Sequence, residues 1–211
     1  MLKRILTRLV DPQYRRPSGI LGRYIGAKMI EQHAPENNWT VELLNAMPND
    51  RILEIGFGGG YAIGRLAEVV TQGLIAGVDF SETMVAEATK RNAAAINAGR
   101  VNLRLADAAK LPLEANAFNK AFSIHSLYFW PEPLKALGEI LRVLQPGGML
   151  VVTFLPKASP DETGNTEFRP YSGAEVVALL HVSGFREMTL HDGRTLTRKS
   201  NYSVVGYKYA N

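Results

Sequence analysis

Short apolar runs alternate with helical patterns along this chain from about Asp50 onward. A run of a few apolar or alternating residues, bounded by polar or glycine-containing segments, predicts a strand. The strands predicted in this way are Arg51–Ile55, Leu74–Asp79, Val101–Leu105, Lys120–Ile124 and Met149–Phe154. Helices are predicted between them over 60–70, from an N-cap at Ser81 to about 98, and over 133–143. This alternation is typical of βαβ units and of an α/β fold with a parallel sheet.

The C-terminal part of the pattern adds two further strands. Gln145-Pro146-Gly147-Gly148 predicts a sharp turn ahead of the fifth strand. Residues 157–170 are mostly polar and predict a loop, of a length that is usually functional or mobile. A helix is then expected over Gly173–Val182, and strands are expected over Phe185–Leu190 and Tyr202–Tyr209. The pattern thus predicts seven strands.

The first 50 residues follow a different pattern. Gly22–Gln32 and Thr40–Ala46 predict two helices, separated by a polar link over Pro35–Asn38. A segment of this size is too short to bury a core of its own. We therefore expect residues 1–48 to form an N-terminal helical cap on a single domain that spans residues 49–211.

A glycine-rich loop joins the first predicted strand to its helix. Glu54 ends the strand, and Gly56, Gly58 and Gly60 follow at alternate positions. Glycines in such a turn permit positive φ and close backbone approach to a ligand, which the free N–H groups of the helix then face. A dinucleotide fingerprint needs glycine at 61 or 63, where Tyr61 and Ile63 stand. The loop therefore predicts a nucleotide-like ligand other than NAD.

The E-x-G-x-G-x-G loop, including Phe57, resembles that of the class I S-adenosylmethionine-dependent methyltransferases (the methyltransferase type 11 kind). The resemblance extends over about residues 50–209. It implies a Rossmann-like, seven-stranded, mostly parallel sheet with helices on both faces. It also implies that S-adenosyl-L-methionine is the cofactor, S-adenosyl-L-homocysteine being the product, and that Glu54 reaches its amino group, usually through water.

Other positions match the family in the same order. Asp79, at the end of the second strand, would accept from the ribose hydroxyls, which suits an ionised carboxylate. Asp107 would accept from the adenine amino group, and Ala108 would offer a backbone N–H. Phe80 and Met84 would line the adenine and ribose, or would be ordinary core residues.

The exit of the fourth strand holds the candidate chemistry. His125 and Ser126 fall where ligands bind in open α/β sheets, so both are expected at the cofactor. His125 is a candidate general base, with simple packing or substrate orientation as the alternative. The candidates for the acceptor pocket are Tyr24, Trp39, Tyr128 and Trp130.

The distribution of charge along the chain indicates which classes of binding partner to expect. Residues 1–30 hold seven basic residues and one acid, a net charge of +6, whereas the remainder has 17 basic and 19 acidic residues, a net charge of −2. A slightly acidic body makes nucleic acid an unlikely partner. The basic N-terminus, with Leu2, Ile5, Leu6 and Leu9 on one helical face, predicts either a docked cap helix or a weak peripheral membrane contact.

Cysteine is absent and we recognise no paired histidine and carboxylate spacing, so no metal site is predicted. No apolar run is long enough to span a bilayer and no signal peptide is evident, so a cytoplasmic location is expected. The expected function is S-adenosylmethionine-dependent methylation, at N, O or C, of a small molecule that is partly apolar or lipid-like. The alternative is a cofactor-binding protein or a non-methylating enzyme on the same fold.

Overall fold

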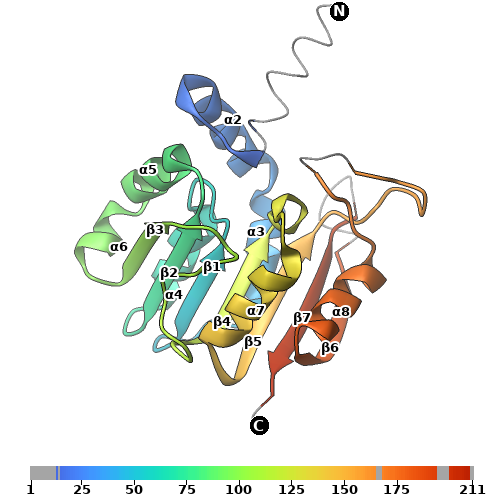
Figure 1. Cartoon of the computed structure of the whole chain (residues 1–211). Coiled ribbons are helices and arrows are strands. Elements are labelled where there is room, and N and C mark those ends of the chain that lie inside the picture. Colours follow the sequence, from blue (N-terminus) through green and yellow to red (C-terminus); the bar gives the residue numbers. More distant parts are fainter. Residues whose placement is uncertain (1–12, 14, 165–167, 194–199, 210–211) are drawn as a thin grey trace, which may run out of the picture.

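A seven-stranded sheet forms the centre of the computed structural model, which describes residues 13, 15–164, 168–193 and 200–209 (Figure 1). The strand order is β3-β2-β1-β4-β5-β7-β6, with β1 to β5 parallel and β7 antiparallel to both of its neighbours. The strands are β1 (Arg51–Ile55), β2 (Leu74–Asp79), β3 (Val101–Leu105), β4 (Phe118–Ile124), β5 (Leu144–Phe154), β6 (Phe185–Asp192) and β7 (Tyr202–Lys208). The predicted α/β class and the mostly parallel sheet are confirmed.

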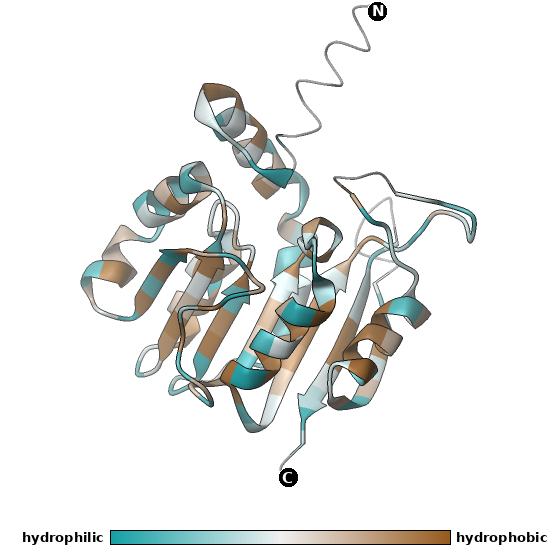
Figure 2. Cartoon of the chain, viewed as in Figure 1, coloured by the Kyte–Doolittle hydropathy of each residue, from teal (hydrophilic) through white to brown (hydrophobic). Residues whose placement is uncertain are grey.

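Helices cover both faces of this sheet. They are α2 (Gly19–Gln32), α3 (Ala34–Leu44), α4 (Tyr61–Val69), α5 (Glu82–Arg91), α6 (Ala93–Asn97), α7 (Pro133–Val143) and α8 (Gly173–Val182), with a 3₁₀ turn η1 (Leu127–Phe129). Successive residues of β1 serve opposite faces: Ile52 packs in the core with α3 to α6, and Leu53 packs in the core with α7 and α8. Figure 2 shows the result, with apolar strands inside and polar outer surfaces on α7.

Several predicted boundaries differ from the structure by a few residues, and two of the differences have a clear physical cause. The predicted turn at 145–148 lies within β5, since Phe118 pairs with Leu144 and Lys120 with Met149, and the extra residues form an irregularity between them. The single helix expected after Ser81 is divided at Asn92. The Asn92 side chain donates to the carbonyls of Gly60 and Ala88, at 3.0 and 2.9 Å, and so ties this break to the glycine loop.

The cap is more helical than predicted. The polar link expected at Pro35–Asn38 is wrong, because α3 begins at Ala34 and carries Pro35 in its first turn, where a missing N–H costs nothing. A chain of buried hydroxyls attaches α3 to the sheet: Thr40 Oγ1 lies 2.6 Å from Thr153 Oγ1, which lies 2.6 Å from Ser203 Oγ.

Helix α2 lies beyond the end of the sheet where the parallel strands finish (Figure 1). It is joined to the main domain there by the Ser81 hydroxyl, which donates to the carbonyl of Pro17 at 2.6 Å. The amphipathic helix predicted over residues 2–9 falls outside the described residues. Among the helices that are described, none has the length and apolar character needed to cross a membrane.

Candidate functional site

A cavity of about 210 Å³ opens at the carboxyl ends of the parallel strands. One wall is the loop after β1 and the end of β2, and a second is formed by residues that follow β3 and β4. The cap supplies the remaining wall, from 15 to 37. This is the place where α/β sheets bind ligands, because the loops diverge there and leave backbone N–H groups free.

The glycine loop wraps tightly around one side of the cavity. Gly56, Gly58 and Gly60 adopt φ values of 74°, 50° and 72°, a region in which other residues are strained. A Cβ on Gly60 would also lie 2.6 Å from Asn92 Nδ2. The loop therefore depends on glycine for its path, as its pattern predicted, although Gly60 itself stands behind the cavity wall.

Asp79 supports this loop from the end of β2. Its Oδ2 accepts from Gly58 N at 2.9 Å and its Oδ1 accepts from Ser81 N at 2.8 Å. Burial raises the pKa of Asp79, and these backbone N–H groups oppose the rise. Each carboxylate oxygen has a second lone pair, so both can still accept from a ligand hydroxyl in the cavity.

Glu54 is a buried carboxyl in the cavity wall. Glu54 lies near the carboxyl end of β1 and is only 2% exposed to solvent. Its Oε2 has no hydrogen-bond partner among the described residues. Burial and, to a lesser degree, the charge of Asp79 raise the pKa of Glu54 to about 8. A buried carboxyl of this kind is stabilised by a cation, and the cavity beside it can hold one.

The residues that the resemblance places at adenine and ribose also lie at the cavity. Asp107, Ala108, Phe80 and Met84 all line it. Asp107 is exposed, and its Oδ1 accepts from the Ala109 backbone at 2.8 Å. Met84 is 3% exposed, so it serves the core and the wall together.

His125 and Ser126 also lie in the wall, after β4. His125 has a φ of 53°, an uncommon backbone conformation that often marks a functional position. Its Nδ1 is 3.0 Å from the Tyr128 hydroxyl. Burial, reinforced by the neighbouring His33, lowers the pKa of His125 to about 3. So low a pKa matches poorly with general-base work near neutrality, and the base role of His125 stays a prediction.

The Ser126 hydroxyl has a structural task. It donates to the carbonyl of Ile55 at 3.0 Å and contacts Ser123 Oγ at 2.6 Å. A Cβ on Gly56 would lie 2.5 Å from the Ser126 Cβ. Ser126 therefore holds the exit of β4 against the glycine loop, and its position in the wall follows from that contact.

Of the four aromatic residues predicted for the acceptor pocket, the structure places Trp130 on the cavity wall and three elsewhere. Tyr24 is 59% exposed and lies under the Lys28 ammonium, which is 4.9 Å from its ring. Trp39 is half-buried on the far side of α3 from the lining residues. Tyr128 is buried behind the wall, where its hydroxyl accepts from Leu155 N.

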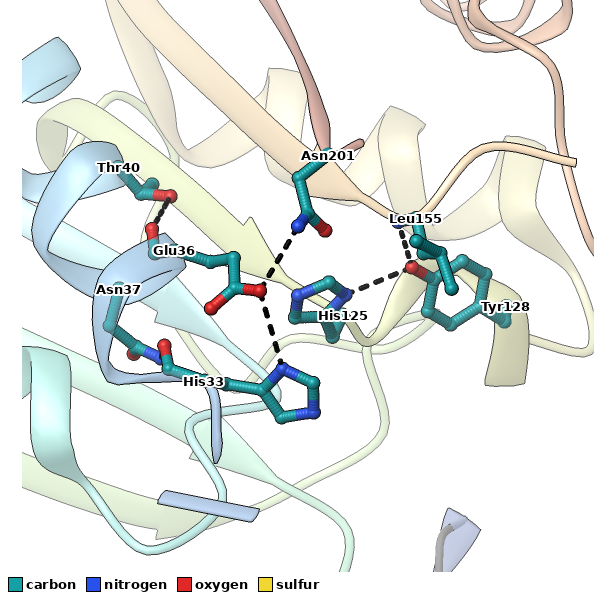
Figure 3. Close-up of polar contacts among 8 residues, drawn as sticks. All are labelled: His33, Glu36, Asn37, Thr40, His125, Tyr128, Leu155 and Asn201. Atoms are coloured by element: carbon teal, nitrogen blue, oxygen red, sulfur yellow. Dashed lines mark hydrogen bonds and ion pairs between the residues drawn. The ribbon is translucent and has the colours of Figure 1, made fainter. Parts of the chain in front are cut away.

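The cap contributes wall residues that the sequence patterns did not predict. Met29, Ile30, His33 and Asn37 line the cavity, and Ile30 lies directly against Gly59 of the glycine loop. Glu36 lies just behind them, 4% exposed, with Asn201 Nδ2 donating to its Oε1 at 3.0 Å (Figure 3). One histidine and carboxylate pair was missed in the sequence: His33 and Glu36 stand three residues apart, the spacing of one helical turn.

These residues fit the cofactor that the sequence suggests. The Glu54 carboxyl, unpartnered among the described residues, suits an ammonium group, Asp79 suits vicinal hydroxyls, and the apolar side chains of Phe80 and Met84 suit a flat base. Glu54, Asp79 and the glycine loop would hold it, while Asp107 would face its base.

Comparison with known proteins agrees with this geometry. Residues 53–152 match the model of a family described as "Methyltransferase domain". The chain is 28% identical over 168 residues to an uncharacterized methyltransferase, YdaC, of Bacillus subtilis, covering 78% of this chain and 87% of that protein. It is 30% identical over 162 residues to an O-methyltransferase, rstn1, of Aspergillus nomiae, covering 72% of each. The crystal structure of SpnF, a [4+2]-cyclase, shares the fold with a TM-score of 0.75 and 24% identity, covering 85% of this chain and 83% of that one.

Proposed function

This chain belongs to the class I S-adenosylmethionine-dependent methyltransferase family, and on that premise we propose that it methylates a small, partly apolar molecule. The observation that carries the proposal is the buried Glu54 carboxyl in the cavity wall, whose Oε2 has no hydrogen-bond partner within the described part of the chain and would be stabilised by a cation such as the cofactor's ammonium group. The cofactor itself supplies, when bound, a methyl group activated by a positively charged sulfur.

The residues of the chain would act mainly by binding and orientation. The glycine loop and Asp79 would fix one ligand at the sheet end, while the cap wall from 15 to 37 would hold the acceptor against it. Holding two reactants in line and excluding water supplies much of the acceleration in such a transfer. The relative described as an O-methyltransferase supports oxygen as the acceptor atom.

A second candidate function follows from the cyclase that shares this fold. In this alternative the chain keeps the cofactor site and is a non-methylating enzyme. The cavity is compatible with both candidates, because its wall can position a reactant with or without a transferred group.

Calorimetry tests whether the cofactor binds, and a transfer assay then distinguishes the methyltransferase from the non-methylating enzyme. We expect the full chain to bind S-adenosylmethionine and S-adenosylhomocysteine, and Asp79→Ala to weaken both strongly because it removes the carboxylate that faces the cavity. Incubation with methyl-labelled cofactor and a panel of phenols and enols should then give labelled products. Absence of binding by the wild type would refute the proposal, and binding without labelled product from the panel or from cell extract would favour the second candidate.

A further inference from the structure

Three side chains that could bind a metal ion meet beside the cavity (Figure 3). His33 joins α2 to α3, Glu36 lies in the first turn of α3, and His125 follows β4. One nitrogen from each histidine and one carboxylate oxygen all lie within 4.8 Å of one another. His33 Nδ1 is 3.8 Å from Glu36 Oε1, and the two imidazole centroids are 4.5 Å apart.

Each of these side chains also has a buried polar atom without a hydrogen-bond partner among the described residues. The atoms are His33 Nδ1, Glu36 Oε2 and His125 Nε2. A buried polar atom left without a partner costs about 1–3 kcal/mol, so three in one place need a common explanation. The Glu36 side chain is 5% exposed, which makes its unpartnered oxygen the most expensive of the three.

The surroundings hold the three groups in place. Asn201 Nδ2 donates to Glu36 Oε1 at 3.0 Å, and the hydroxyl of Tyr128 lies 3.0 Å from His125 Nδ1. Thr40 donates to the Glu36 carbonyl at 2.8 Å, which steadies the turn of α3 that carries the carboxylate. Imidazole and carboxylate ligands of metal ions are commonly oriented by hydrogen bonds of this kind from a second layer of residues.

We propose that His33, Glu36 and His125 form a binding site for one divalent transition-metal ion, for which Zn²⁺ is the best chemical match. Two imidazoles and one carboxylate are a ligand set of catalytic zinc sites, which keep a fourth position open. The imidazoles disfavour Mg²⁺ and Ca²⁺, which prefer oxygen ligands, and the absence of thiolates disfavours Cu⁺. In the bound form the Nδ1 proton of His125 would be donated to the oxygen of Tyr128.

The required adjustment is small. Two ligands that each lie about 2.1 Å from a tetrahedral ion are about 3.4 Å apart. The 3.8 Å between His33 Nδ1 and Glu36 Oε1 is close to this value, and the other separations, at most 4.8 Å, need shifts of about 1 Å. His33 can supply such a shift, because its side chain is 35% exposed and lies at the junction of two helices.

The open side of the site would take an oxygen of the acceptor. His33 and His125 both line the cavity that also contains Glu54 and Asp79, so a fourth ligand would approach from the cavity. A metal ion binds a hydroxyl or carboxyl oxygen and makes a hydroxyl more acidic. This choice of an oxygen acceptor rests on the proposed methyl transfer, whereas the metal site itself does not.

Metal binding can be measured with Zn²⁺ alone on the full chain, prepared without a histidine tag and stripped with a chelator. We expect about one equivalent of Zn²⁺ per chain by calorimetry and elemental analysis, and Co²⁺ should give the visible absorption bands of a four-coordinate site. Glu36→Gln and His33→Gln should each weaken Zn²⁺ binding by more than about 100-fold, because each removes a direct ligand.

Matched controls identify the site. Glu42→Gln changes an exposed carboxylate of the same helix, and His181→Gln changes an exposed histidine of α8, so both should bind Zn²⁺ like the wild type. Circular dichroism on each variant checks that it is folded, and His33→Gln serves if Glu36→Gln is not. Absence of stoichiometric binding, or equal binding by folded Glu36→Gln or His33→Gln, would refute the site and leave a buried water as the partner of these atoms.

The same samples separate this inference from the proposed function. Calorimetry with S-adenosylmethionine is carried out on the metal-free chain. Cofactor binding without Zn²⁺ binding would overturn the metal site and leave the methyltransferase proposal standing. Zn²⁺ binding without cofactor binding would do the reverse.

Discussion

Replacing Glu54 by glutamine should stabilise the free protein and at the same time weaken its cofactor binding. The carboxyl is buried, and its pKa is raised from 4.5 to about 8. The folded state therefore holds a proton that the unfolded chain releases between these pH values, so the free energy of unfolding decreases as pH rises through this range. At 1.36 kcal/mol per pKa unit, the cost to the wild type is about 3 kcal/mol at pH 7.

Glutamine has nearly the same shape and no charge, so the variant should lose this pH dependence. We expect Glu54→Gln to be more stable than the wild type by about 2 to 4 kcal/mol at pH 8, where the carboxyl is almost fully ionised in the unfolded chain and only about half ionised in the folded one. Near pH 4.5 the carboxyl is protonated in the folded state, so the two proteins should differ little.

The same substitution should have the opposite effect on the cofactor. A charge-assisted hydrogen bond contributes about 1.5–3 kcal/mol, so its loss predicts an affinity that is weaker by about tenfold or more. In the wild type an ammonium group would favour the ionised carboxyl. Binding at pH 7 should therefore release up to about 0.9 proton, the protonated fraction expected for a pKa near 8.

Urea denaturation between pH 5 and pH 8 measures the first effect, and calorimetry in buffers of different ionisation enthalpy measures the proton release. Glu68→Gln is the matched control, since the Glu68 side chain on α4 is 64% exposed and should affect neither quantity. The reasoning fails if wild-type stability does not decline with pH over this range, or if Glu54→Gln is the less stable protein at pH 8.

Three further substitutions probe the loop and its supports. Asp79→Asn should reduce cofactor affinity by about 10- to 100-fold in calorimetry, because the amide keeps one acceptor oxygen and loses the charge; equal affinity would remove Asp79 from the site. Gly60→Ala should cost more stability in thermal denaturation than Gly99→Ala: both have positive φ, 72° and 74°, but only Gly60 lacks space for a Cβ. An equal loss would show that the contact with Asn92 is unimportant. Thr153→Val should cost about 1–3 kcal/mol of unfolding free energy by breaking the buried hydroxyl chain to α3, and a neutral result would mean that this chain does not hold the cap.

Local pattern was sufficient to predict most of the sheet. β1, β2 and β3 begin and end where their apolar runs do, and α7 and α8 match their predicted ranges. These elements are bounded by turn residues that act locally, so neighbours in sequence determine their ends. The break after Arg91 was missed because it depends on Asn92 reaching the carbonyl of Gly60, a contact across 32 positions.

The part of the candidate site that lies at the strand ends could be predicted from local pattern. Residues at strand ends, such as Glu54, Asp79 and His125, must come together once the strands are parallel, and they do line one cavity. The cap wall could not be predicted in this way, because its packing depends on contacts such as Thr40 with Thr153, 113 positions away. Tyr24 was predicted to line the acceptor pocket but does not, because the helical pattern of α2 does not show which side of the helix meets the cavity.

The lining of the cavity comes from separate parts of the chain. Residues 54–108 supply the part that suits the cofactor, whereas 15–37 and 124–131 supply the remainder. An exchange of the first 48 residues with those of another such protein would therefore replace much of the acceptor surface while keeping Glu54, Asp79 and the glycine loop. In this architecture acceptor preference can diverge quickly, because changes in one short terminal segment alter what is methylated without altering the methyl donor.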